Sequence, residues 1–286
     1  MQTHNPVAAA CAAIARVERG ATVHRLEHAG TTVVWRRFGN GPPMVLLHGG
    51  HGSWLHWLRN VEPLAANHTV LVPDMPGFGE SDDIDGDPHA ADRLDRALAA
   101  LGGTLDQLIA PQGLISLIGF SYGGVVAAAF AARRGMVERM ALIGPGGHGT
   151  ARRQPVPMVD WRLDDTTAMR AALRHNLRVQ MLHDPDAVDS LSLEIHERSC
   201  VATRFRSRAI SRASVLKDHL AAITAPILFL WGEHDVTADP KVAAPHVTES
   251  RPDRPWRIIP GAGHWAQYEN PHSVNRMLVE WFGPPK

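Results

Sequence analysis

Three residues whose side chains cooperate in covalent catalysis stand far apart along this chain of 286 residues: Ser121, Asp235 and His264. A serine hydroxyl is a weak nucleophile until a neighbouring base takes its proton and a third group orients that base. Ser121 is the serine of a Gly-x-Ser-x-Gly stretch that follows an apolar run and precedes a helical pattern of small residues. A strand-to-helix turn of this kind exposes the hydroxyl, so we predict that Ser121 is the nucleophile.

The acid and the base follow the serine in the chain order that suits such a turn. Asp235 comes directly after the apolar run 227–231, and His264 comes after the β-rich run 256–259. We expect Asp235 to hold the imidazole of His264 in the tautomer that accepts the serine proton. Glu233 and Asp239 lie close by in the sequence and are the alternatives for the acid.

Negative charge that develops on a carbonyl oxygen needs backbone N–H donors near the nucleophile. Tyr122 directly follows Ser121, and the His-Gly-Gly-His-Gly loop at 48–52 offers a second amide, which we assign to Gly50. His48, His51 and His56 invite an interpretation as a metal cluster, but no carboxylates stand near them in the sequence. We therefore expect packing beneath the loop, and no metal or other cofactor.

Strands and helices alternate along most of the chain and would place these residues at one edge of a sheet. The strands are expected at 22–27, 31–38, 44–47, 69–72, 114–118, 140–143, 227–231 and 256–259. Helical patterns occur at 7–15, 55–66, 88–100 and 125–132. This alternation predicts an α/β fold with a mostly parallel central sheet flanked by helices, and ligands bind outside the carboxyl ends of such strands.

The interval 145–224 breaks this rhythm, because it is rich in arginine, helix-like and without a clear strand. We interpret it as a helical cap inserted after the sixth strand. Residues 1–144 and 225–286 then form the core of one domain.

Composition excludes several classes of protein. The 29 basic and 29 acidic residues cancel, so we expect neither a nucleic-acid partner nor a membrane surface. No run approaches a membrane span, and the Ala-rich segment 7–15 lacks the basic start of a signal peptide. The two cysteines match no metal spacing, which favours a reducing, cytoplasmic location.

From about Leu26 to Phe282 the chain resembles the α/β-hydrolases, and among them the hydrolases of meta-cleavage products that cut carbon–carbon bonds. Three stretches carry this resemblance: Gly144-Pro145-Gly146-Gly147, the segment 74–82 that begins Asp-Met-Pro-Gly-Phe-Gly, and Gly-His-Trp-Ala-Gln-Tyr-Glu at 263–269. The resemblance implies an α/β-hydrolase fold and cofactor-independent hydrolysis of a small molecule such as a 2-hydroxy-6-oxo-dienoate. Homo-oligomers are common among such enzymes.

The resemblance also implies residues that bind the substrate. The family's cap carries an arginine for the substrate carboxylate, and Glu197-Arg198 falls at its place, so Arg198 is the expected anchor. Trp265 would line the pocket beside His264. The other arginines of the cap are expected to be solvated or paired: Arg170, Arg174, Arg178, Arg204, Arg206, Arg208 and Arg212.

Two departures from the family pattern concern the substrate. Phe120 and His56 stand where the family usually has polar groups, often Asn, that hold a dienolate. The loop after His-Gly-Gly is also shorter, since it runs directly through His51. We expect all three residues to contact the substrate. The chemistry then stays open between carbon–carbon cleavage and a carboxylesterase, with a perhydrolase or haloperoxidase-like enzyme and a small-molecule receptor as further alternatives.

Overall fold

A single eight-stranded sheet forms the centre of the protein in a computed structural model that describes residues 5–283. Its strands are β1 (Thr22–His28), β2 (Thr31–Phe38), β3 (Pro43–Leu47), β4 (Thr69–Asp74), β5 (Ile115–Phe120), β6 (Val137–Ile143), β7 (Ile227–Gly232) and β8 (Trp256–Ile259). They lie in the order β1-β2-β4-β3-β5-β6-β7-β8. Only β2 pairs antiparallel, with β1 and with β4, and the remaining pairs are parallel. This arrangement is the α/β-hydrolase fold predicted from the sequence.

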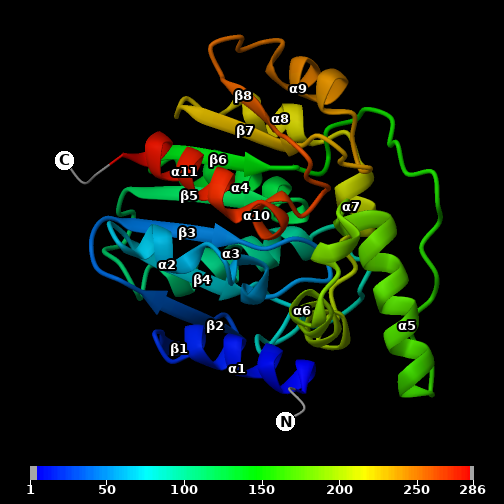
Figure 1. Ribbon diagram of the computed structural model, residues 1–286. Coiled ribbons are helices and arrows are strands. Elements are labelled where there is room, and N and C mark those ends of the chain that lie inside the picture. The colour runs from blue at the N-terminus through cyan, green and yellow to red at the C-terminus, as the bar shows by residue number, and fades with distance from the viewer. Residues whose placement is uncertain (1–4, 284–286) are drawn as a thin grey trace.

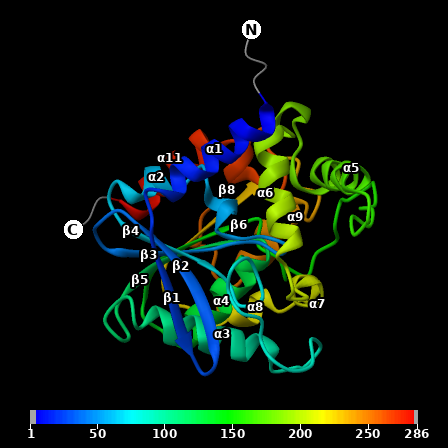
Figure 2. The same ribbon diagram turned by 90° about the horizontal axis from the view of Figure 1, so that it is seen from below.

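Helices cover both faces of the sheet (Figures 1 and 2). One face is covered by α3 (Arg93–Leu105), α4 (Tyr122–Arg134), α8 (Leu216–Ala221) and α9 (Pro240–Thr248). The other face is covered by α1 (Pro6–Glu18), the 3₁₀ turn η1 (Trp54–Trp57), α2 (Val61–Ala65), α10 (Ala266–Glu269) and α11 (Pro271–Phe282). Because both faces are covered, the central strands are apolar throughout, and every residue of β5 and β7 is buried.

The insertion between β6 and β7 lies over the carboxyl ends of the strands, at the right of Figure 1. It comprises α5 (Thr166–Asn176), the π-turn η2 (Leu177–Met181), the 3₁₀ turn η3 (Pro185–Ala187), α6 (Ser190–Val201) and α7 (Arg208–Arg212), and no strand forms within residues 145–224. Helix α8 also comes before β7, but it packs on α4, and its Leu216 and Leu220 join the core cluster on that face. The covering part of the insertion therefore ends at α7.

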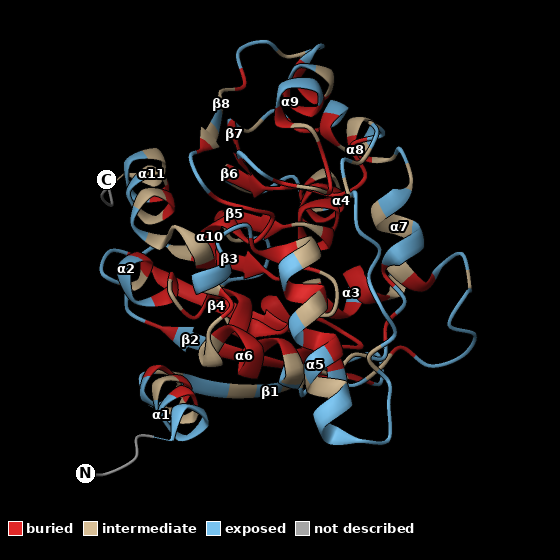
Figure 3. Cartoon of the chain, turned by 45° about the vertical axis from the view of Figure 1, so that its right-hand side comes forward, coloured by how far each residue is buried: buried red, intermediate tan, exposed pale blue. Residues whose placement is uncertain are grey.

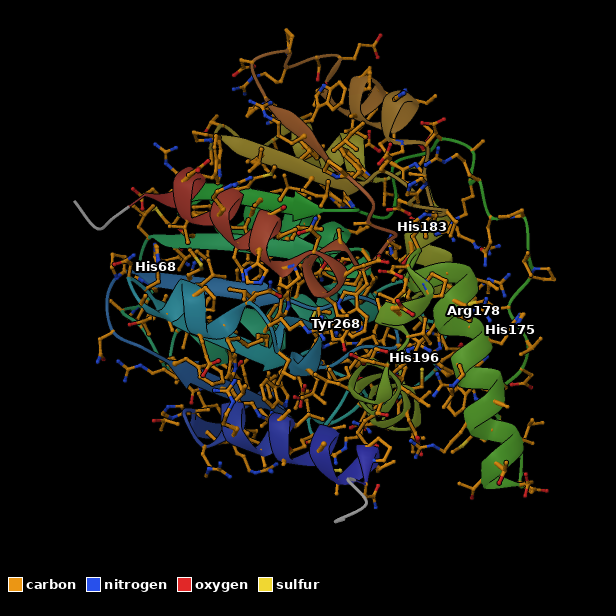
Figure 4. The ribbon with its side chains drawn as sticks, in the orientation of Figure 1. His68, His175, Arg178, His183, His196 and Tyr268 are labelled. Atoms are coloured by element: carbon orange, nitrogen blue, oxygen red, sulfur yellow. The ribbon has the colours of Figure 1, made fainter. Side chains whose placement is uncertain are left out.

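The core and the insertion differ in how far their residues are buried (Figure 3). The strands at the centre of the sheet are buried, whereas α5 and α7 turn exposed surfaces outward. Tyr268 of α10 connects core and cap, since its hydroxyl donates a 2.9 Å hydrogen bond to Asp189 in the cap and the guanidinium of Arg59 lies 3.8 Å from its ring. Figure 4 shows Tyr268 on the core side of the cap helices.

Two helix predictions differ from the structure. The run 55–66 is not one helix, but a 3₁₀ turn followed by α2. Pro63 explains the break: it has no N–H and its ring would clash with the carbonyl of Arg59, whereas the first turn of α2 tolerates it. The helix expected at 88–100 runs from Arg93 to Leu105, because a turn in which Asp87 accepts from the His89 N–H delays its start and buried Leu101 and Leu105 extend its end.

Candidate active site

The turn between β5 and α4 holds Ser121 in a strained backbone conformation, with φ 54° and ψ −117°. The Ser121 N–H donates to the Ile143 carbonyl of β6 at 2.9 Å, which fixes the turn against the neighbouring strand. The start of α4 packs closely against β3, where a Cβ on Gly123 would lie 2.3 Å from the Leu47 carbonyl oxygen. The glycine therefore lets helix and strand approach, and the turn presents the serine side chain at the carboxyl edge of the sheet.

Three strand ends bring Ser121, His264 and Asp235 into one hydrogen-bonded chain. The Ser121 Oγ lies 2.9 Å from His264 Nε2, and His264 Nδ1 lies 2.8 Å from Asp235 Oδ2. Thr237 donates to the other carboxylate oxygen of Asp235 from its backbone N–H at 2.7 Å and from its hydroxyl at 2.8 Å. This geometry suits a hydroxyl whose proton passes to an imidazole held by a carboxylate.

The carboxylate of Asp235 is fully buried and stays charged. Burial alone would raise its pKa, but the charge of His264 and the hydrogen bonds from His264 and Thr237 outweigh that effect and lower the pKa below its ordinary value. The two alternative acids lie elsewhere. Glu233 accepts from the Gly261 N–H at 3.0 Å, and Asp239 caps α9 through the Lys241 N–H. Within residues 5–283, Asp235 is the acid that bonds to His264.

The two residues predicted to offer backbone amides lie close to the serine. Tyr122 is the first residue of α4, so its N–H has no carbonyl to bind within that helix. Gly50 lines the cavity at Ser121, and a Cβ placed on it would lie 3.7 Å from Tyr122 Cβ. Gly50 therefore lies next to Tyr122, at the cavity that Ser121 lines.

Beneath this loop lie two fully buried, neutral histidines. His48 donates from Nδ1 to the Gly49 carbonyl at 2.8 Å and accepts the Met75 N–H on Nε2 at 3.0 Å. Burial lowers its pKa to about 4, and burial lowers the pKa of His56 well below its ordinary value. His56 accepts the Gly49 N–H on Nδ1 at 3.2 Å. These bonds shape the loop, and no group of residues suited to a metal ion occurs in the described chain.

The space in front of Ser121 has two parts. A small cavity of about 90 Å³ is lined by Ser121, His264, Phe120, Gly50 and residues of the cap. A larger cavity of about 310 Å³ lies next to it and shares the lining residues His51, Gly50 and Arg208. The cap supplies most of the larger wall, including Trp161, Asn176, His196 and Cys200; Figure 4 shows His196 among the cap helices.

The predicted substrate contacts divide into two groups. Phe120 and His51 line the cavities, and His51 does so with a left-handed backbone, φ 52°. His56 and Trp265 instead lie behind the wall, fully buried, where the Trp265 indole donates to the His56 carbonyl at 3.1 Å. Trp265 therefore packs under the site, against Tyr268.

Arg198 does not point into either cavity, contrary to the expectation from its motif. Its Nε donates to Glu194 one turn earlier on α6 at 2.8 Å, and its Nη2 lies 3.2 Å from Cys11 of α1. The Glu–Arg spacing of four residues on one helix face gave the signal for this pairing. The guanidinium faces α1 and solvent, away from Ser121.

The sequence interpretation missed a different set of arginines. Arg152, Arg208 and Arg212 all line the small cavity with Ser121. Arg208 and Arg212 stand one turn apart on α7, and like charges at this spacing without an acid beside them were the available signal. Thr237 and Gln180 also line this cavity, and the first was detectable from its place two residues after Asp235.

A scan against family models matches residues 44–277 to the alpha/beta hydrolase family. A 2-hydroxy-6-oxononadienedioate/2-hydroxy-6-oxononatrienedioate hydrolase from Cupriavidus pinatubonensis is 29% identical over 255 residues, which covers 84% of this chain and 86% of that protein. A 2-hydroxy-6-oxo-6-phenylhexa-2,4-dienoate hydrolase from Burkholderia cepacia is 29% identical over 261 residues, covering 85% and 88%.

Solved structures of the same fold include enzymes of two kinds. A mutant of the meta-cleavage product hydrolase CumD superposes with a TM-score of 0.75 at 22% identity, covering 91% of this chain and 97% of that one. An esterase from a Rhodococcus species superposes with a TM-score of 0.72 at 25% identity, covering 92% of this chain and all of that one. The likeness to relatives named as hydrolases of 2-hydroxy-6-oxo compounds agrees with the resemblance seen in the sequence motifs. None of the described helices has the length and apolar character needed to cross a bilayer.

Proposed function

Because the chain belongs to the alpha/beta hydrolase family, we propose that it is a cofactor-independent serine hydrolase that cleaves a carbon–carbon bond of a 2-hydroxy-6-oxo-dienoate-like compound. The observation that carries this proposal is the hydrogen-bonded chain of Ser121, His264 and Asp235, which opens into a cavity covered by the cap. The names of the relatives support the substrate class, since they are hydrolases of 2-hydroxy-6-oxo-dienoates.

In this proposal the reaction begins with proton transfer within the substrate. His264 assists the conversion of the dienol to its keto form. The carbon fragment that leaves later can then depart as a stabilised enolate. Ser121, or a water that it helps to activate, then attacks the ketone carbonyl. His264 Nε2 lies 2.9 Å from the hydroxyl and takes its proton, while Asp235 stabilises the imidazolium.

The charge on the attacked oxygen is received by the N–H groups of Gly50 and Tyr122. Each donor of this kind contributes about 3 kcal/mol to the transition state. The carbon–carbon bond then breaks, and the enolate leaves with its electron pair and takes from His264 the proton that the serine gave up, which leaves the imidazole neutral. Water, deprotonated by His264, releases the acyl group as a carboxylic acid and returns the serine to its starting state.

An ester substrate is the second candidate, and the apolar side chain of Phe120 favours it. Phe120 lines the cavity directly before the serine, where the family usually offers a polar group to a dienolate. The 25% identical structural neighbour is an esterase. The same serine, imidazole and amides serve an acyl-enzyme route with an alkoxide as leaving group, so only turnover separates the two candidates.

The test compares two probes with the purified protein: a short-chain p-nitrophenyl ester and a 2-hydroxy-6-oxo-dienoate. Carbon–carbon hydrolysis predicts a kcat/KM for the dienoate that exceeds the ester value by orders of magnitude, and its loss in Ser121→Ala. Preference for the ester would contradict the dienoate assignment and leave an esterase. Binding of either probe without turnover would contradict both and favour a receptor.

A further inference from the structure

Three arginines line the Ser121 cavity, and none of them has an acidic partner among residues 5–283. Arg208 and Arg212 come from α7, and Arg152 comes from the chain that follows β6. In residues 5–283 no carboxylate lies within ion-pair distance of any of the three, and the residues lining this cavity include no Asp or Glu. We refer to Arg152, Arg208 and Arg212 as the arginine cluster.

Two other arginines of the cap pair with acids. Arg170 pairs with Glu197 at 2.7 Å, and Arg162 of the larger cavity lies 3.8 Å from Asp160, which lines the same cavity. The charge of Asp235 acts on Arg152, but both oxygens of Asp235 already accept bonds from His264 and Thr237. The three guanidinium groups at Ser121 therefore have no ion-pair partner among residues 5–283.

The charges of the other two guanidinium groups reach Arg152. Burial and the charge of Arg212 lower the pKa of Arg152, the charge of Asp235 opposes them, and the charge of Arg208 lowers it further. Like charges gathered beside a partly enclosed cavity are stabilised when an anion enters between them, and guanidinium forks match the two oxygens of a carboxylate.

We propose that the arginine cluster binds a carboxylate group of the substrate next to Ser121, so that anion selectivity resides in α7 and the loop after β6. This inference needs Ser121 as the reacting residue, but not carbon–carbon cleavage. The small cavity of about 90 Å³ takes the short anionic end, and the cavity of about 310 Å³, lined by Met158, Trp161 and Cys200, takes the bulkier part. Arg208 lines both and marks their junction.

The first experiment compares two acyl esters that differ in one charge: mono-p-nitrophenyl glutarate and its neutral methyl ester. Wild-type protein should prefer the anionic ester. Arg208→Gln and Arg212→Gln should each reduce its kcat/KM by about 10- to 100-fold, as expected for the loss of a charged hydrogen bond, and should lower kcat/KM for the neutral ester far less, so that the preference collapses. Both arginines are exposed, so these variants should remain folded.

The matched control is Arg206→Gln. Arg206 precedes α7 but lines a different hollow and contacts His89, so the preference for the anionic ester should persist. Equal loss of both esters in the cluster variants, or loss of the preference in the control alone, would overturn the proposal. Raised salt should weaken the preference in the wild type and have little effect in the double variant Arg208→Gln/Arg212→Gln.

A second measurement does not depend on turnover. A neutral fluorophosphonate labels an activated serine, and occupancy of the site slows the labelling. Glutarate should protect Ser121 from labelling, glutaramide should not, and the double variant should lose the protection by glutarate. Equal protection by both compounds would overturn the arginine cluster as a carboxylate site. Protection by glutarate in a protein that cleaves no dienoate would support the cluster and count against the proposed carbon–carbon reaction only.

Discussion

The two walls of the active-site cavity are built on opposite principles. The core wall consists of strand ends, where Asp235 is fully buried and His264 nearly so. His264, which bonds to the serine, is held by Asp235, and Asp235 is held by Thr237. The cap wall consists of short helices whose Arg208 and Arg212 are exposed and have no acidic partner within residues 5–283.

Under the two proposals, this difference separates the groups that react with the substrate from those that select it. Groups that must hold fixed distances during proton transfer lie on the rigid sheet, where neighbouring strands determine their positions. Groups that wait for a charged ligand lie on a covering segment and remain unsatisfied without one. Changes on the core wall should therefore abolish chemistry on every substrate, whereas changes on the cap wall should alter the choice among substrates.

The largest effect is expected from Ser121→Ala. Removal of the nucleophile should reduce kcat by roughly 10⁶-fold on any hydrolysed substrate, because the remaining residues of such a triad do little without it. Steady-state turnover and thermal unfolding measured side by side would check this, with the fold expected to be intact. Activity near the wild-type level in a folded variant would remove Ser121 from the mechanism.

Asp235→Asn should come next, with a loss in kcat of roughly 10⁴-fold, because an amide no longer holds His264 in the tautomer that accepts the serine proton. Glu233→Gln is the matched control, since Glu233 is exposed and bonds to the Gly261 N–H. Its kcat should equal that of the wild type. Reversal of the two results would transfer the role of the acid to Glu233.

Acid should lower the free energy of unfolding, because the core wall contains buried histidines. Burial lowers the pKa of His48 from 6.5 to about 4 in the folded protein. Below pH 6.5, His48 therefore binds a proton in the unfolded chain but stays neutral in the folded chain. The free energy of unfolding falls as the pH drops toward 4. His48 alone accounts for a loss of about 3 kcal/mol.

Urea unfolding at several pH values measures this loss. The fall in stability between pH 6.5 and 4 should be smaller in His48→Gln than in the wild type, even if the variant starts from a lower stability. His272→Gln removes an exposed histidine and should keep the wild-type slope. Identical slopes in all three proteins would show that His48 is not the group that resists protonation.

The smallest effect is expected from Arg198→Gln. Its ion pair with Glu194 is half exposed, so the free energy of unfolding should change by about 1 kcal/mol or less. The ratio of kcat/KM values for the anionic and neutral glutarate esters should stay at the wild-type level. A collapse of that ratio would place the carboxylate anchor on α6 instead of α7.

The contrast between the walls also explains how far the sequence could lead. The positions of all eight strands, Ser121, Asp235 and His264 follow local rules, because apolar runs and the strand-to-helix turn are encoded within a few residues. The prediction that Arg198 contacts the substrate was wrong for a non-local reason. Cys11 of the N-terminal helix and Glu194 hold the guanidinium, and the contact with α1 exists only after folding.

The arginine cluster escaped sequence analysis for the same reason. Arg152 precedes Arg208 by more than fifty positions, and nothing in either local pattern places them at one cavity. Helix propensity alone also gave a wrong prediction for the segment 55–66. There a single residue, Pro63, prevents one continuous helix although the rest of the pattern favours it. Motifs identify the chemistry, and tertiary packing decides which charges meet the substrate.

The most direct test of the central claim, an activated serine on the core wall, is mapping of the residue that a neutral fluorophosphonate modifies. Intact-mass and peptide analysis should find a single adduct on Ser121. The adduct should be absent in Ser121→Ala and should form far more slowly in Asp235→Asn. An adduct on another residue, or labelling that persists unchanged in Ser121→Ala, would contradict the account.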